Sequence, residues 1–238
     1  MKTLMTVATL SAGLLFAPGA NATLMLSLDV GGTLFSCVDN TACDTNAAVG
    51  VLQVANQTIN NVTFNGSIQS STGTTNTPGT PTLNTSSLSI INGNATDISL
   101  AAAIGDTNFI GPANQFFSSV SATFQNAVGS TFTYNFYDDP TNQQGAQATN
   151  DTPGTQIDTS TKTVTLIADS FAHTATGSVT DPGLFSMTES IFGTLIANGQ
   201  IINNGQTEIK NAIPEPTSLA MLGLGCVALG FLRRKRNV

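Results

Sequence analysis

The chain of 238 residues has no tryptophan, two tyrosines and a single histidine, His173. It also lacks the G-x-S-x-G, H-E-x-x-H and Walker phosphate-loop motifs of common catalytic sites. A lone imidazole in a strand-like stretch is more typical of a half-exposed sheet residue than of a general base, and sugar-processing sites normally use Trp and Tyr platforms. We therefore expect no enzyme here and keep a cryptic carbohydrate-active hydrolase, acting through two scattered carboxylates, as the last alternative.

Positive charge is scarce between residues 23 and 211, where Lys162 and Lys210 stand against thirteen acidic residues and leave a net charge of −11. Because this segment has no arginine, it cannot neutralise phosphates, which excludes nucleic acid and anionic lipid headgroups as major partners. Most of its other polar residues are Thr, Ser, Asn and Gln. Such an uncharged polar surface suits a protein that works outside the cell.

Helical periodicity is also missing, whereas apolar and polar residues alternate strictly in several places. This alternation predicts strands at residues 24–30, 62–68, 98–104, 132–136 and 164–168. Other apolar stretches indicate strands at residues 49–54, 87–91, 115–124, 184–192 and 206–210. Gly31-Gly32 predicts a two-residue hairpin turn, and residues 70–85 and 138–160 predict long surface loops. We expect an all-β fold, a single antiparallel β-sandwich of about ten strands.

The amino-terminal end has the three parts of a secretory signal peptide: Lys2, an apolar stretch over residues 4–17, and Ala20-Asn21-Ala22 as a small-x-small cleavage site. Pro18-Gly19 interrupts the apolar run where signal peptidase needs an extended substrate. A buried amino-terminal helix is the alternative. The sequence thus predicts a signal peptide over residues 1–22 and an extracellular domain over residues 23–211.

At the other end, Pro214-Glu215-Pro216 precede an apolar run over residues 218–232 and a basic tail of Arg233, Arg234, Lys235 and Arg236. Clustered positive charge keeps to the cytoplasm, so the chain before Pro214 is expected on the far side of the inner membrane. A helix of roughly fifteen residues spans only about 22 Å of a hydrocarbon core of about 30 Å. This favours a transient membrane tether, and a permanent single-pass anchor is the alternative.

Residues 212–238 resemble the sorting signal of the PEP-CTERM family of exported bacterial proteins, with Pro214, Glu215 and Pro216 as the motif. The resemblance implies that exosortase, a membrane-embedded transpeptidase-like enzyme, cuts near this motif, after which the body is released or attached to the cell surface. It also implies a role in the extracellular polysaccharide matrix or biofilm. Without it, Pro-x-Pro would be a rigid spacer. Residues 24–51 resemble the start of the body in one group of these proteins, which brings no activity with it.

Cys37 and Cys43 are the two cysteines between residues 23 and 211, and the short polar segment between them predicts a disulfide. The wider spacing than C-x-x-C and the shortage of further ligands make a redox or thiolate metal site improbable. The same turn carries four hard oxygen donors, which suggest a calcium site: Asp39, Asn40, Asp44 and Asn46. Asp and Asn also satisfy turn backbone, which is the competing explanation. Residues 138–142 offer a weaker version of the same hypothesis.

Three functions remain, in this order: a surface or matrix structural protein, a calcium- or glycan-binding module, and a cryptic hydrolase. Apart from calcium, we expect no cofactor. The expected partners are signal peptidase and exosortase during export, the membrane before processing, and extracellular polysaccharide.

Overall fold

The structure is a computed structural model that describes residues 23–71 and 80–211. Over these residues the chain forms twelve strands and no helix: β1 (Met25–Val30), β2 (Thr33–Val38), β3 (Val51–Ile59), β4 (Val62–Ser71), β5 (Thr82–Asn92), β6 (Ile98–Ile110), β7 (Ala113–Gln125), β8 (Thr131–Asp139), β9 (Thr155–Thr163), β10 (Ala168–Asp181), β11 (Leu184–Leu195) and β12 (Gln200–Lys210). None of the described segments is therefore a membrane-spanning helix. The expected signal peptide and the apolar run over residues 218–232 lie outside the described ranges.

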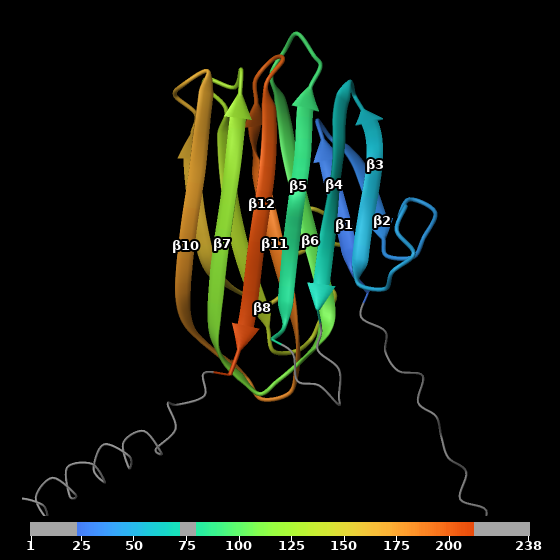
Figure 1. Cartoon of the computed structure of the whole chain (residues 1–238), viewed down its shortest axis with the longest axis vertical. Helices are drawn as coiled ribbons and strands as arrows, with labels where there is room; N and C mark the ends of the chain where they lie inside the picture. The colour runs from blue at the N-terminus through green and yellow to red at the C-terminus, as the bar shows by residue number, and fades with distance from the viewer. Residues whose placement is uncertain (1–22, 72–79, 212–238) are drawn as a thin grey trace, which may run out of the picture.

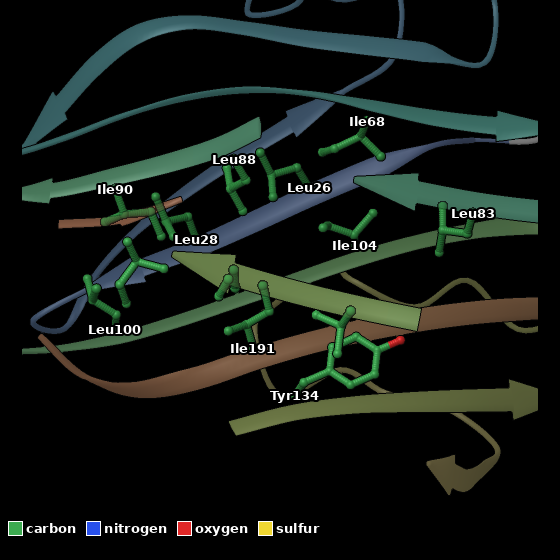
Figure 2. Packing of buried hydrophobic residues seen from close by; sticks show 14 of the residues in the cluster. Leu26, Leu28, Ile68, Leu83, Leu88, Ile90, Leu100, Ile104, Tyr134 and Ile191 are labelled. Carbon is green, nitrogen blue, oxygen red and sulfur yellow. The ribbon is translucent and has the colours of Figure 1, made fainter. Parts of the chain in front are cut away.

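The strands form two six-stranded antiparallel sheets that face one another (Figure 1). Sheet A has the order β2-β1-β6-β11-β8-β9, and sheet B has the order β10-β7-β12-β5-β4-β3. Side chains at alternate positions point between the sheets and form one core, part of which Figure 2 shows. The expected two-sheet antiparallel sandwich is confirmed for this part of the chain.

Aromatic pairs join the two sheets across the core. Phe116 on β7 meets Phe136 on β8 at 6.2 Å between ring centroids, and Phe124 meets Phe132 at 5.8 Å, both edge to face. The buried Tyr134 hydroxyl lies 3.0 Å from the Ser118 hydroxyl, so its polar end has a partner in the opposite sheet. Edge-to-face pairing adds about 0.5–1.5 kcal/mol per pair to the burial of the rings.

The hairpin at the start of the fold agrees with the sequence. Gly31 and Gly32 connect β1 to β2, and both have positive φ angles, 58° and 87°. Two successive positive φ angles are the requirement of a type I′ turn, which glycine meets without a steric penalty.

Two parts of the expected strand pattern are wrong. Residues 164–167 connect β9 to β10 instead of forming a strand, and β9 itself lies within the segment predicted as a long loop. The reason is that β9 is an edge strand whose inward positions include Asp158 and Lys162, and these contact polar groups of β10. Alternation of apolar residues cannot reveal a strand of this kind. With β2 and β9 added, the count is twelve rather than about ten.

The segment between β8 and β9, residues 140–154, folds back over the outer face of sheet A. The Ser27 hydroxyl on β1 donates a hydrogen bond to the Ala146 carbonyl. A Cβ at Gly105 on β6 would lie 2.9 Å from the backbone of Gly145, so only glycine permits this approach. This segment covers part of sheet A, whereas the outer face of sheet B carries no such cover among the described residues.

Strand β1 begins and strand β12 ends at the same end of the sandwich (Figure 1). The loop over residues 39–50 and the turn between β10 and β11 lie at this end too. The part of the chain that precedes the sorting motif therefore leaves the fold beside its point of entry.

Candidate functional site

The disulfide expected from the sequence is present. Cys37 lies at the buried end of β2 and bonds to Cys43 in the following loop, with 5.7 Å between the two Cα atoms. The bond closes the short loop that carries Asp39 and Asn40.

Asp44 organises the backbone of this loop. Its Oδ2 accepts a hydrogen bond from the Asn40 amide at 3.0 Å, and its Oδ1 accepts from the amides of Asn46 and Gln53 at 2.9 Å each. Partial burial raises the pKa of this carboxyl, but the backbone donors from Gln53, Asn46 and Asn40 outweigh it and hold the pKa below its usual value. The two oxygens of Asp44 thus serve as acceptors for the turn.

The other three residues of the calcium hypothesis fall into two groups. Asp39 Oδ2 accepts from the Gly50 amide at 2.7 Å, and Asn46 Oδ1 accepts from the Ala48 amide at 2.9 Å, both of which are turn contacts. Asn40 is exposed and takes the left-handed conformation at φ 59°. Burial and the nearby Asp44 raise the pKa of Asp39, whose Oδ1 is buried without a hydrogen-bond partner.

The loop therefore brings Asp39 and Asp44 together, but mainly to satisfy backbone donors. Across residues 23–71 and 80–211, no group of three or more His, Cys, Asp and Glu side chains is arranged to hold a metal ion. Calcium binding at this loop stays a prediction.

The weaker acidic motif, residues 138–142, divides between two roles. Asp139 accepts hydrogen bonds from the amides of Thr141 and Gln143, both at 2.9 Å, and fixes the start of the loop that covers sheet A. Asp138 points the other way, into the sandwich, and is 5% exposed. There it lies within hydrogen-bonding reach of Asp181 from the end of β10 in sheet B.

This carboxyl pair has no cation to balance it. Burial, followed by the charges of Asp181 and Asp139, raises the pKa of Asp138 to about 7. Burial likewise raises the pKa of Asp181 to about 6, although its hydrogen bond with Asp138 works in the opposite direction. Asp138 therefore takes up the proton first and donates it to Asp181, which is how two carboxyls in close contact avoid ionising together.

A third buried acid, Glu189 on β11, lies in the middle of the core. Its Oε1 accepts a hydrogen bond from the Thr207 hydroxyl on β12 at 3.0 Å. Burial raises its pKa to about 8, with a smaller opposing effect from Thr207. Gly205 leaves room for the carboxyl, since a Cβ there would lie 3.2 Å from Glu189 Oε2 and 2.7 Å from the Thr85 hydroxyl.

His173 lies on β10 and is partly exposed, as the sequence suggested. Its Nε2 is 2.9 Å from Oδ1 of Asp158 on β9, and nearby Lys162 on β9 forms an ion pair with Asp169 on β10 at the same distance. Because β9 and β10 belong to different sheets, these two pairs close one edge of the sandwich.

The core offers no chamber for a metabolite in this region. A cavity lined by Leu28, Ile90 and Ile191 among others has a volume of about 20 Å³. A space of this size holds about one water molecule.

Sequence reasoning missed Asp106, Asp181 and Glu189. Glu189 and Asp106 do carry a signal, because a carboxyl inside or next to an expected strand is rarely buried without a partner. Asp181 carries none, since it belongs to an Asp-Pro-Gly turn, where aspartate is common. Its contact with Asp138 depends on how the two sheets are superposed.

The predicted sorting motif and basic tail lie outside the described residues, but the sequence comparison reaches them. Residues 212–236 match the PEP-CTERM protein-sorting motif, so the expected resemblance to that family of sorted proteins is confirmed. A comparison with curated proteins found no match.

Three solved structures share some of the β-architecture. TmCBM61 in complex with beta-1,4-galactotriose is 10% identical, with a TM-score of 0.31 over 52% of this chain and 71% of the other. The isomalto-dextranase of Arthrobacter globiformis T6, complexed with panose, is 13% identical, with a TM-score of 0.26 over 66% and 23%. The structure of infectious bursal disease virus, Gx strain, is 16% identical, with a TM-score of 0.25 over 85% and 53%. At these TM-scores the three likenesses carry no functional assignment.

Proposed function

We propose that this chain is an exported protein that exosortase processes at its carboxy-terminal motif, and that its β-sandwich then acts at the cell surface as a structural component of the extracellular matrix. The match of residues 212–236 to the PEP-CTERM protein-sorting motif is the observation that carries the proposal. A motif of this type implies export, a temporary membrane tether and transfer to the surface.

The fold supports the same conclusion. Strand β12 ends at Lys210, one residue before the described part of the chain ends and shortly before Pro214. A cut near Pro214 would therefore leave every strand in place. The disulfide between Cys37 and Cys43 also suits an oxidising compartment.

The described side chains favour a structural role over catalysis. The acids in the core contact one another or a threonine hydroxyl, and His173 pairs with Asp158 at a sheet edge. A hydrolase would need two carboxylates across an open cleft. In the proposed function the protein is a scaffold and turns over no substrate.

Mass spectrometry of the mature surface protein tests the proposal. We expect an amino terminus near Thr23 and a new carboxy terminus near Pro214. A Glu215→Ala variant should retain the basic tail and accumulate in the membrane fraction, whereas a Glu208→Ala variant, changed in the last strand, should be processed normally. Intact Arg233–Val238 peptides on nearly all surface molecules would refute processing.

A further inference from the structure

Sheet B has a bend that crosses three adjacent pairs of strands. The pairing register shifts between Val54 and Gln57 on β3, between Asn65 and Ser67 on β4, and between Asn203 and Gly205 on β12. The registers place these irregularities side by side, because Val54 pairs with Gly66, and both Gly66 and Asn204 lie opposite the extra residue on β5. Aligned bulges bend a sheet and hollow its surface.

Two residues show that the bend is built into the backbone. Ser87 on β5 has a φ of 53°, which is uncommon outside glycine and asparagine. A Cβ at Gly66 would lie 2.9 Å from the Leu88 Cα, so the strands approach too closely for any larger residue. Strained positions of this kind persist only where the surrounding structure holds them, and they gather at binding sites.

The bend produces a groove on the outer face of sheet B with a volume of about 480 Å³. This volume lies within the usual range of ligand sites. Nine residues from three strands line it, and all are uncharged: Gln53, Val54, Ala55, Asn56, Asn65, Gly66, Ser67, Ser86 and Ser87.

The amides in the groove are positioned but only half used. Asn65 Nδ2 donates to Asn56 Oδ1 at 2.9 Å, and the Ser87 amide donates to Asn204 Oδ1 at 2.7 Å. No hydrogen bond among the described residues uses the Asn56 amide donors or the Asn65 amide oxygen. The groove thus presents donors and acceptors together with the hydroxyls of Ser67, Ser86 and Ser87.

The charge of the molecule selects the ligand class. A body with net charge −11 and two lysines repels anionic polymers, and none of the groove residues offers a cation to counter this. A ligand with many neutral hydroxyls matches the alternating donors and acceptors. We propose that this groove binds a neutral polysaccharide chain.

Such binding would give the matrix protein of the proposed function its point of attachment, and in that sense it rests on that function. The two fail separately, however, because binding is measured on purified protein whether or not exosortase cuts it.

The experiment uses the full-length chain in mild detergent, with a panel of neutral polysaccharides (dextran, laminarin and galactan) and the anionic alginate. Affinity electrophoresis should show retardation by at least one neutral polymer and none by alginate. The Asn56→Ala/Asn65→Ala double variant should weaken the retardation at least fivefold, since one lost hydrogen bond is worth about that factor in affinity. Gln115→Ala, on the same face of sheet B but outside the groove, is the matched control and should bind like the parent protein.

Thermal unfolding of each variant shows whether it is folded, and Asn65→Asp provides a second variant at the same position. The added charge should abolish the retardation with little change in shape. Lack of retardation by all three neutral polymers would overturn the proposal. Retardation by alginate, or retardation that the groove variants leave unchanged, would overturn it too.

Discussion

At the scale of single residues, the unusual feature of this protein is its buried carboxyl groups. Asp106, Asp138, Asp181 and Glu189 all lie in or at the end of the core, and burial raises the pKa of each. A raised pKa means that the folded state holds protons that the unfolded state has already released. Stability contributed by these groups is therefore full at low pH and is lost as the pH rises.

Glu189 provides the sharpest test. Its pKa is about 8 in the folded protein against an ordinary value of 4.5, so the free energy of unfolding should fall as the pH rises between these values. Glu189→Gln cannot ionise and should remove a fall on the order of a few kcal/mol. Urea unfolding of both proteins at pH 5 and pH 8 measures the difference. An equally steep pH dependence in the variant would show that Glu189 does not retain its proton in the core.

At the scale of elements, short-range patterns predicted much of the fold. The strands of alternating residues, such as β4 and β6, begin where expected, because each buries one face. The hairpin of β1 and β2 follows from Gly31-Gly32, and the disulfide from the spacing of Cys37 and Cys43. Strand β9 escaped because its contacts with β10 are polar.

The loop after β2 shows how a candidate site is reinterpreted at this scale. Asp44 accepts three backbone hydrogen bonds, which is the role that competed with calcium binding. Asp44→Ala should lower the free energy of unfolding by about 1–2 kcal/mol in EDTA, because three backbone donors lose a charged acceptor. Chemical unfolding of the parent protein and the variant measures this cost.

Calcium chloride added to the same samples tests the competing hypothesis. With Asp44 acting in the turn, calcium should leave the melting temperature of both proteins unchanged. A calcium-dependent rise in the parent protein that is absent from Asp44→Ala would establish a calcium site instead, since a ligand of the folded state alone raises its stability.

At the scale of the whole molecule, the order of strands in space differs strongly from their order in sequence. Strand β12, the last of the fold, lies in the middle of sheet B between β7 and β5. Until it is in place, both neighbours lack a partner on that side. The sandwich is thus complete only when the chain has been made and exported up to the residues that precede the sorting motif.

Truncation tests this dependence. A chain that ends at Gly199 should not fold, because β5 and β7 each lose a row of hydrogen bonds and the core loses Ile201 and Ile209. A chain that ends at Asn211 keeps all twelve strands and is the control. Circular dichroism and resistance to protease compare the two. A protease-resistant β-protein ending at Gly199 would contradict the argument.

The sequence by itself determined the features that depend on neighbouring residues: the all-β class, the tight turn at Gly31-Gly32, the disulfide and the sorting motif, which a linear comparison recognises. Only the tertiary structure decided which strands lie side by side. It brought Asp138 to Asp181, placed Glu189 against Thr207, and aligned the bulges that form the groove on sheet B. The physical reason is that antiparallel pairing joins residues far apart in the chain, and its register follows from packing of the whole core rather than from any local pattern.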